Sequence, residues 1–225
     1  MIIVSSGANY QLSKLDVREA VQQAKPATVV AQLEILPEVA LEALKAGKEV
    51  GATTILNTAP APEGWSLEDP GMEFYPYIDI LIPNETELQK LCPKLTADGA
   101  NEETMARSIL EKGVSRAVVV TLGARGAMVV EKKEGDDVQV TLVDAPKDLP
   151  ARQEPVRDTI GAGDAFCGAL STYLSSGLTL PQAATLACGV ASMSVRKPGA
   201  QTSYPTGADL PDCLSIESVK KLIAV

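Results

Sequence analysis

The sequence predicts an α/β fold in which helices cover both faces of a mostly parallel central sheet. Short apolar, strand-like runs alternate with helical patterns along most of the chain, which is the order of elements in such folds. Hydrophobic residues make up 45% of the chain and aromatic residues only 4%. Small aliphatic side chains therefore fill the interior, as is usual where helices pack on parallel strands. A length of 225 residues suits one domain with a large core.

The first half of the chain alternates between expected strands and helices. Val17 and Val21 recur at helical spacing behind a Ser13 cap, and the next helix begins at Pro37 and is closed by Gly51, as helix ends prefer. The expected strands are Met1–Ser6, Thr28–Leu33, Thr53–Asn57, Ile78–Ile82 and Ala117–Leu122. The expected helices are Leu15–Ala24, Pro37–Val50, Asn84–Cys92 and Glu102–Lys112. One irregular segment rich in Pro and Gly, Thr58–Gly71, interrupts the alternation.

The second half begins with a hairpin and ends in helices. The strands Ala127–Lys132 and Val138–Val143 flank Glu134-Gly135-Asp136-Asp137, which is typical of a hairpin tip. The helices expected after the hairpin are Ala162–Ser176, Pro181–Val195 and Ile216–Ala224. In a fold of this kind, ligands bind at the carboxyl ends of the parallel strands.

Charge and the absence of histidine exclude several classes of function. The formal net charge is −9, and Lys and Arg form no cluster, so neither a nucleic acid nor an anionic membrane surface is expected as a partner. Because the chain has no histidine, it contains no Ser-His-Asp triad and no His-ligated zinc. Any proton transfer falls to a carboxylate, Lys, Tyr or Cys side chain.

The cysteines and the hydropathy pattern predict an intracellular protein. The four cysteines show no CxxC spacing, so we interpret them as reduced thiols. The apolar run Met1-Ile2-Ile3-Val4 is too short for a signal peptide and lacks a basic region before it. No stretch approaches the length of about 20 apolar residues that spans a bilayer. The expected location is therefore cytoplasmic, in soluble form.

The sharpest candidate for a functional site is the string Asp158-Thr159-Ile160-Gly161-Ala162-Gly163-Asp164-Ala165-Phe166. Small residues open a helix directly after an extended stretch, so a phosphate could approach the unpaired N–H groups of the helix N-terminus closely. Asp164 in that first turn is favoured in its ionised form by the helix dipole. It would be placed to take a proton from an attacking hydroxyl. The structural alternative is a tight turn followed by an ordinary helix-start residue.

A second candidate is Asn84-Glu85-Thr86-Glu87 at the start of the helix after the fourth expected strand. Asn84 and Glu87 lie three residues apart and therefore share a face of that helix. On structural grounds alone the pair reads equally well as a cap, with Asn at the N-cap and Glu at the third helical position.

Taken together, these strings resemble the signature motifs of the PfkB-type carbohydrate kinases, over essentially all 225 residues. The resemblance implies a ribokinase-like three-layer α/β/α fold, with the whole of residues 1–225 forming a partial kinase domain that holds the nucleotide-binding and catalytic part. It implies that Asp164 is the catalytic base, in contact with both nucleotide and substrate. The amides of Gly161, Ala162 and Gly163 would form the anion hole. Asn84 and Glu87 would order Mg²⁺ near the phosphates of ATP, largely through water.

The resemblance also places a nucleotide site and a monovalent cation site. The turn Thr121-Leu122-Gly123-Ala124-Arg125-Gly126 would line the nucleotide, although a hairpin with two glycines looks the same. Cys188 stands where such kinases often have an Asn near the adenine. The loop Gly199-Ala200-Gln201-Thr202-Ser203-Tyr204-Pro205 would join Asp158 in enclosing K⁺, or would simply pack as a polar loop. The implied K⁺ ligands are Asp158, Ile160, Ser194, Lys197, Gly199 and Ser203.

Within the family, several details favour the ribokinases. Glu34 in Gln32-Leu33-Glu34 matches a sugar-contacting Glu, and Asn57-Thr58-Ala59-Pro60-Ala61 resembles a ribokinase loop in which Thr58 replaces a Pro. The implied reaction transfers the γ-phosphoryl of ATP to the primary (O5) hydroxyl of a small sugar, D-ribose.

The resemblance has one large gap. The family's N-terminal sugar-binding motifs and its β lid have no match in these residues, so the fold is expected to be truncated at the N-terminus, with an apolar edge strand exposed. In the family, the lid also forms the dimer interface. A homodimer is therefore expected only for a full-length form. Two alternatives stay open: a non-catalytic nucleotide-binding protein, and a kinase for another sugar or a nucleoside.

Overall fold

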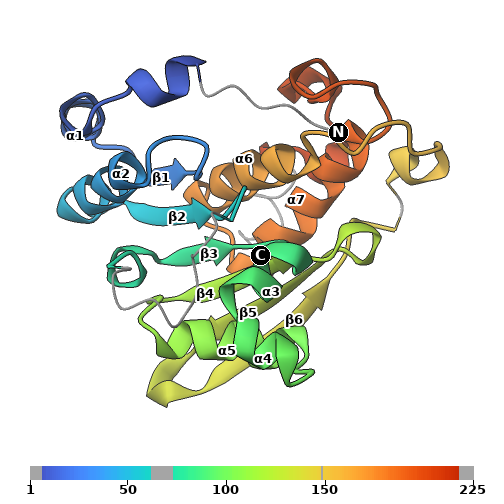
Figure 1. Ribbon diagram of the computed structural model, residues 1–225. Helices are drawn as coiled ribbons and strands as arrows, with labels where there is room; N and C mark the ends of the chain where they lie inside the picture. Colours follow the sequence, from blue (N-terminus) through green and yellow to red (C-terminus); the bar gives the residue numbers. More distant parts are fainter. Residues whose placement is uncertain (1–6, 62–72, 148, 218–225) are drawn as a thin grey trace. The chain divides into compact units, whose positions relative to one another are not determined.

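The computed structural model describes residues 7–61, 73–147 and 149–217. The strand expected at 1–6 lies outside the described residues, and so do part of the irregular segment 58–71 and most of the helix expected at 216–224. Within the described ranges, six strands form one sheet in the order β1-β2-β3-β4-β5-β6 (Figure 1). The strands are β1 (Thr28–Ala31), β2 (Thr53–Asn57), β3 (Ile80–Ile82), β4 (Ala117–Thr121), β5 (Ala127–Lys132) and β6 (Val138–Val143).

The direction of the strands changes along the sheet. The pairs β1–β2, β2–β3 and β3–β4 are all parallel. Short turns join β4 to β5 and β5 to β6, and strands with so short a connection run antiparallel. The bonds Leu122 N–H to Gly126 O and Lys133 N–H to Asp137 O, both 2.8 Å long, close these two turns. The sheet is therefore mostly parallel, and the expected hairpin is confirmed.

Three expected strands are shorter in the structure, because backbone groups at their ends bond elsewhere. The strand expected at 28–33 ends at Ala31, and the Leu33 N–H bonds to Ala59 O at 3.1 Å in the loop after β2. The strand expected at 78–82 begins at Ile80, because the Ile78 N–H closes a 3₁₀ turn on Tyr75 O. The strand expected at 117–122 ends at Thr121.

The helices agree closely with those expected, with one addition. They are α1 (Lys14–Ala24), α2 (Pro37–Glu49), α3 (Glu85–Leu91), α4 (Pro93–Ala97), α5 (Glu102–Glu111), α6 (Ala162–Ser175) and α7 (Leu180–Ser194). Helix α1 carries the expected Ser13 cap, whose hydroxyl accepts the Asp16 N–H at 3.2 Å. Helix α4 was not expected. It begins at Pro93, directly after the last residue of α3 and its cap Cys92, where proline is favoured because its missing N–H costs no hydrogen bond.

The described chain divides into two compact units. The first comprises Met1–Val120 and Val130–Val140, and the second comprises Thr121–Val129 and Thr141–Val225. In the first unit, α2 packs on β1 and β2, and α1 packs on α2 (blue to cyan in Figure 1). Helix α2 approaches β2 closely at Gly47, where an added Cβ would lie 2.8 Å from the Thr54 methyl group. A glycine at this position therefore lets α2 lie directly on the sheet.

In the second unit, α6 and α7 pack against each other along their lengths (orange in Figure 1). Gly189 of α7 lies against Leu214, whose Cδ2 is 2.7 Å from the place of an added Cβ. The Tyr173 hydroxyl of α6 donates to the Leu214 carbonyl, so the segment after α7 is tied back to this helix pair.

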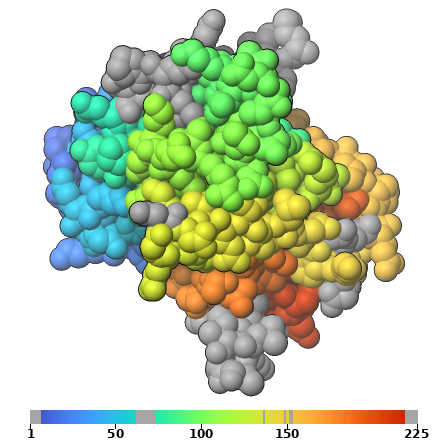
Figure 2. Space-filling view, turned by 90° about the horizontal axis from the view of Figure 1, so that it is seen from below, coloured from blue at the N-terminus to red at the C-terminus, as the bar shows by residue number. Residues whose placement is uncertain are grey.

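The first unit contains two features at the edges of the sheet. The part of the β5–β6 hairpin in this unit, Val130–Val140, lies beside α4 and α5 on one face (yellow and green in Figure 2), and the Arg107 guanidinium of α5 donates to Val138 O at 3.4 Å. At the other edge, β1 pairs with β2 alone among the described strands, and Val30 is 41% exposed. Among the described strands, the edge strand β1 therefore carries an exposed apolar side chain.

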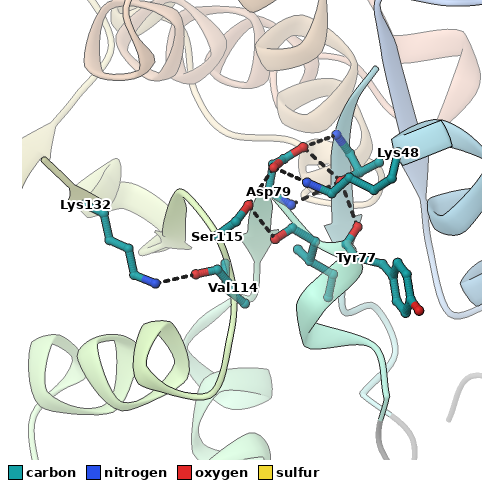
Figure 3. Close-up of polar contacts among 8 residues, drawn as sticks. Lys48, Tyr77, Asp79, Val114, Ser115 and Lys132 are labelled. Atoms are coloured by element: carbon teal, nitrogen blue, oxygen red, sulfur yellow. Dashed lines mark hydrogen bonds and ion pairs between the residues drawn. The ribbon is translucent and has the colours of Figure 1, made fainter. Parts of the chain in front are cut away.

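A polar network closes the amino ends of β2, β3 and β4 (Figure 3). The Asp79 carboxylate forms an ion pair with Lys48, accepts the Thr54 N–H at 2.9 Å and accepts the Ser115 hydroxyl at 2.6 Å. Burial alone would raise the pKa of Asp79, but the hydrogen bonds from Lys48, Ser115 and Thr54 outweigh it and lower that pKa. This end of the sheet is therefore held by an ionised carboxylate.

Candidate active site

The carboxyl ends of β1, β2 and β3 converge on a chain of hydrogen bonds in the first unit. Asn57, the last residue of β2, donates through Nδ2 to Ile82 O at 2.9 Å and accepts from Gln32 at 3.5 Å. The Thr58 N–H donates to Ile82 O at 3.2 Å. Parallel strands bring their carboxyl ends to one edge, so residues from three loops meet there. Glu34, the expected sugar contact, is exposed in the turn after β1.

Asn84 and Glu87 form a reciprocal cap at the start of α3. The Asn84 side chain accepts the Glu87 N–H at 2.8 Å, and the Glu87 carboxylate accepts the Asn84 N–H at 3.0 Å. Glu87 is only 7% exposed, and its carboxylate also accepts the Asn84 side-chain amide at 2.9 Å and the Thr58 hydroxyl at 3.0 Å. A proline at position 58 could donate no such bond. The capping interpretation is therefore correct, and the same arrangement fixes a nearly buried carboxylate at the carboxyl edge of the sheet.

Helix α6 begins in the second unit without a side-chain cap. Its N-cap Gly161 has φ 78°, a left-handed conformation that glycine adopts without strain. The Ala165 N–H makes a bond within the helix, to Gly161 O at 2.9 Å. Ala162, Gly163 and Asp164 form the first turn, and both Gly163 and Asp164 are exposed. The expected anion-hole residues and the expected base thus share one exposed helix start, where N–H groups and the helix dipole favour an anion.

Asp158 joins the start of α6 to the loop after α7. One carboxylate oxygen accepts the Ile160 N–H at 3.0 Å, and the other accepts the Gly199 N–H at 2.9 Å. These two bonds, in that order, lower the pKa of Asp158, so the carboxylate is ionised. Ser203 is 1% exposed and donates to Ala200 O at 2.6 Å, and the Ser194 carbonyl accepts the Lys197 N–H at 3.2 Å. The structure thus brings the expected cation-loop residues into one connected segment.

The glycine-rich turn after β4 is a 3₁₀ turn over Gly123–Arg125. Gly126 has φ 84° and lies so close to the last residue of β6 that an added Cβ would be 2.0 Å from Val143 O. The glycine is therefore required by close backbone packing, whatever else the turn does.

Cys188 lies on α7 and is nearly buried, at 8% exposure. Burial, followed by the charge of Asp144, raises the pKa of its thiol to about 12. The thiol is therefore protonated at neutral pH and is not a nucleophile.

One contact at the start of α6 is not predicted by any sequence motif. The Tyr204 hydroxyl donates to Asp164 Oδ2 at 3.2 Å. The two residues are 40 positions apart, and the only sequence signal is that Tyr204 lies in the same loop as Ser203.

No helix among the described residues is both long and apolar enough to cross a membrane. Those same residues contain no cluster of three or more His, Cys, Asp or Glu side chains that could hold a metal ion. The candidate sites described above consist instead of single carboxylates supplemented by amide, hydroxyl and backbone oxygens.

This combination of a mostly parallel α/β sheet and an uncapped, glycine-led helix start with an acid in its first turn is characteristic of a phosphate-binding enzyme. The sequence model of the pfkB family carbohydrate kinase matches residues 1–207. The chain belongs to this family.

The curated relatives include ribokinases and deoxyribokinases. Mouse ribokinase is 34% identical over 214 residues, which cover 94% of this chain and 62% of the mouse protein. Deoxyribokinase of Salmonella typhi is 32% identical over 216 residues, which cover 96% of this chain and 65% of the relative. The chain thus spans slightly less than two thirds of the length of these relatives.

Solved ribokinase structures share the fold. Ribokinase from Thermotoga maritima matches with a TM-score of 0.69 and 28% identity, over all of this chain and 65% of that one. Ribokinase from Arabidopsis thaliana, in complex with ribose and ATP, matches with a TM-score of 0.68 and 27% identity, over the same shares of the two chains. These matches confirm the ribokinase-like α/β fold.

Proposed function

We propose that this chain is a ribokinase-like sugar kinase that transfers the γ-phosphoryl of ATP to the primary (O5) hydroxyl of D-ribose. The observation that carries the proposal is the position of Asp164, in the exposed first turn of a helix that starts at Gly161 without a side-chain cap. A ribokinase that is 27% identical to the chain binds ribose and ATP, which supports these two compounds as substrates.

In the proposed mechanism, Asp164 accepts the proton of the sugar hydroxyl while that oxygen attacks the γ-phosphorus, and the bond from the γ-phosphorus to the β–γ bridging oxygen breaks to release ADP. The N–H groups of Gly161, Ala162 and Gly163 donate to the phosphoryl oxygens as negative charge develops on them. The turn from Thr121 to Gly126 lines the nucleotide, and Glu34 contacts the sugar.

The residues at the start of α3 fit Mg²⁺, which prefers oxygen ligands and keeps several waters. The Glu87 carboxylate is held nearly buried by three hydrogen bonds, from the Thr58 hydroxyl, the Asn84 N–H and the Asn84 side-chain amide. We propose that Asn84 and Glu87 order the hydrated ion. Bound there, Mg²⁺ would neutralise charge on the phosphates of ATP.

The loop at Asp158 fits a monovalent cation such as K⁺, because its donors are all oxygens and its carboxylate is ionised. We propose ligation by the side chains of Asp158 and Ser203 and by the backbone carbonyls of Ile160, Ser194, Lys197 and Gly199. The Asp158–Gly199 bond of 2.9 Å already holds the two halves of this loop together.

The four cysteines are free thiols, which supports the proposed cytoplasmic location, where thiols stay reduced. We propose a homodimer only for a form that carries the family's lid.

A coupled ADP-release assay with ATP, Mg²⁺, K⁺ and ribose tests the proposal. Sugar-dependent turnover is expected, and Asp164→Asn should lower it by about 10²–10⁴-fold, because general-base catalysis contributes that much. ATP affinity should stay nearly unchanged. The matched control is Asp209→Asn, which removes another exposed acid of the second unit. Near-normal turnover of Asp164→Asn would contradict the assigned role of this carboxylate.

The acceptor is tested by comparing ribose with 2-deoxyribose, adenosine and fructose. The 32% identity to a deoxyribokinase makes 2-deoxyribose the alternative to examine first. Nucleotide binding without turnover on any acceptor would favour a non-catalytic nucleotide-binding protein, an alternative supported by the partial coverage of the relatives.

A further inference from the structure

Tyr204 reaches the start of α6 from a loop that follows α7. Its hydroxyl donates to Asp164 Oδ2 at 3.2 Å, and its side chain is half-buried. Asp164 is exposed, and an exposed carboxylate on a helix start has several rotamers available to it. A hydrogen bond from a held partner therefore restricts the direction in which the carboxylate points.

The loop that carries Tyr204 is held at several points. The Gly199 N–H donates to Asp158 at 2.9 Å, and the Ser203 N–H donates to Ala200 O at 2.9 Å in a 3₁₀ turn. Ser203, the residue before Tyr204, is 1% exposed. The tyrosine is thus placed by a buried neighbour and an anchored loop.

The Tyr204 ring also lies against the N-cap of α6. A Cβ added to Gly161 would lie 2.5 Å from the phenol oxygen and 2.9 Å from Cε1. These distances show that the absence of a side chain at Gly161 leaves the room that the phenol occupies. Tyr204 thus contacts both the first residue of the proposed anion hole and the proposed base.

The chemistry of the pair fixes the direction of the hydrogen bond. A phenol O–H can donate, whereas the oxygens of a carboxylate accept, in agreement with the bond from the Tyr204 hydroxyl to Asp164 Oδ2. Bonds of this kind, to a charged acceptor, are stronger than bonds between neutral groups.

We propose that Tyr204 is a positioning residue that holds the Asp164 carboxylate at the start of α6 in the direction needed to receive the proton of the sugar hydroxyl. The inference rests on the proposed kinase function. It adds a residue outside the motif that contains Asp164, and it makes the loop after α7 part of the catalytic arrangement.

The kinetic test compares Tyr204→Phe with the wild-type chain. The variant keeps the ring against Gly161 and removes only the hydroxyl, so kcat should fall about 10-fold, the value of one hydrogen bond to a charged group. The KM for ATP should change less than about twofold. Tyr173→Phe is the matched control, because it removes a buried hydroxyl of the same unit that donates to the Leu214 carbonyl. An unchanged kcat in Tyr204→Phe, or an equal loss in Tyr173→Phe, would overturn the proposal.

A second measurement does not depend on turnover. The chain contains five tyrosines, so labelling with 3-fluorotyrosine gives five ¹⁹F resonances, and Tyr204→Phe identifies the one from position 204. Asp164→Asn should shift that resonance, and Asp209→Asn should leave it unchanged. A resonance that does not respond to Asp164→Asn overturns the contact. If the wild-type chain shows no turnover but its Tyr204 resonance still shifts in Asp164→Asn, the result contradicts the proposed function. The same result supports the Tyr204–Asp164 contact.

Discussion

At the scale of single residues, Gly161 meets two requirements at once. Its φ of 78° lies in the left-handed region, which costs an L residue with a Cβ about 1–2 kcal/mol. An added Cβ would also lie 2.5 Å from the Tyr204 hydroxyl. Gly163, two residues later, has neither constraint, because no heavy atom lies within 4 Å of its added Cβ. The two glycines of one motif are therefore under different structural constraints.

This difference gives a prediction. Gly161→Ala should lower the free energy of unfolding by about 1–3 kcal/mol, because backbone strain and the contact with Tyr204 add. Gly163→Ala should leave that free energy unchanged or raise it by less than about 1 kcal/mol. Urea unfolding followed by circular dichroism measures both. Equal losses in the two variants would show that Gly161 has no special conformational role.

At the scale of secondary-structure elements, the start of α3 has a structural role and a proposed functional role. Asn84 caps the helix and donates to the nearly buried Glu87. Helix α5 offers a comparison, since its N-cap Asn101 accepts the Thr104 N–H at 2.9 Å at an exposed position. Both asparagines stabilise a helix, but only Asn84 lies at the carboxyl edge of the sheet.

The two caps can be separated experimentally. Asn84→Ala and Asn101→Ala should each lower the free energy of unfolding by about 1 kcal/mol, the usual value of an N-cap. Only Asn84→Ala should raise the Mg²⁺ concentration that gives half-maximal turnover. The expected increase is about 10-fold, because the loss of a residue that orients metal ligands weakens metal binding by about this factor. If Asn101→Ala raised it equally, general destabilisation would explain the effect and the Mg²⁺ assignment would be wrong.

The ends of helices and strands were mostly predictable where the interaction that sets them lies within one turn of the chain. Pro37 and Asn84 identify the starts of their helices, because proline geometry and side-chain capping act within one turn. The end of β1 was not predictable, because the Leu33 N–H bonds to Ala59 O in a distant loop. The start of β3 was missed although its cause is local, because a strand pattern does not reveal the 3₁₀ turn that the Ile78 N–H closes on Tyr75 O. Helix α4 was missed because five residues are too few for a periodic pattern.

At the scale of the whole molecule, the Asp79 network makes stability depend on pH. The pKa of Asp79 is lowered from its ordinary value of 3.8 in the folded state, so the unfolded chain binds this proton more readily. The stabilisation is therefore present above pH 3.8 and is lost as the pH falls through the folded-state pKa.

Asp79→Asn should lower the free energy of unfolding by roughly 1–3 kcal/mol at pH 7, because it breaks a hydrogen-bonded charge network. The difference from wild type should shrink as the pH falls below 3.8. Asp98→Asn, at an exposed position, should change stability by less than about 0.5 kcal/mol at either pH. Urea titrations at several pH values measure the effect, and a difference that stays constant with pH would contradict it.

The sequence also predicts the family, because the motif around Asp164 and the cap at Asn84 are both contiguous strings. The contacts Thr58–Glu87 and Tyr204–Asp164 were not predictable in the same way. Each joins segments that are far apart in the sequence, and each depends on how a loop without regular structure is anchored.

The position of the Asp79 network has a practical consequence for engineering. It lies where β2, β3 and β4 begin, whereas the loops at Asn57 and Asn84 follow the points where β2 and β3 end. Heat resistance could thus be improved by redesigning residues around Lys48 and Ser115, without altering the loops that hold the candidate magnesium ligands. A library of variants restricted to that end would leave Asn57, Asn84 and Glu87 unchanged.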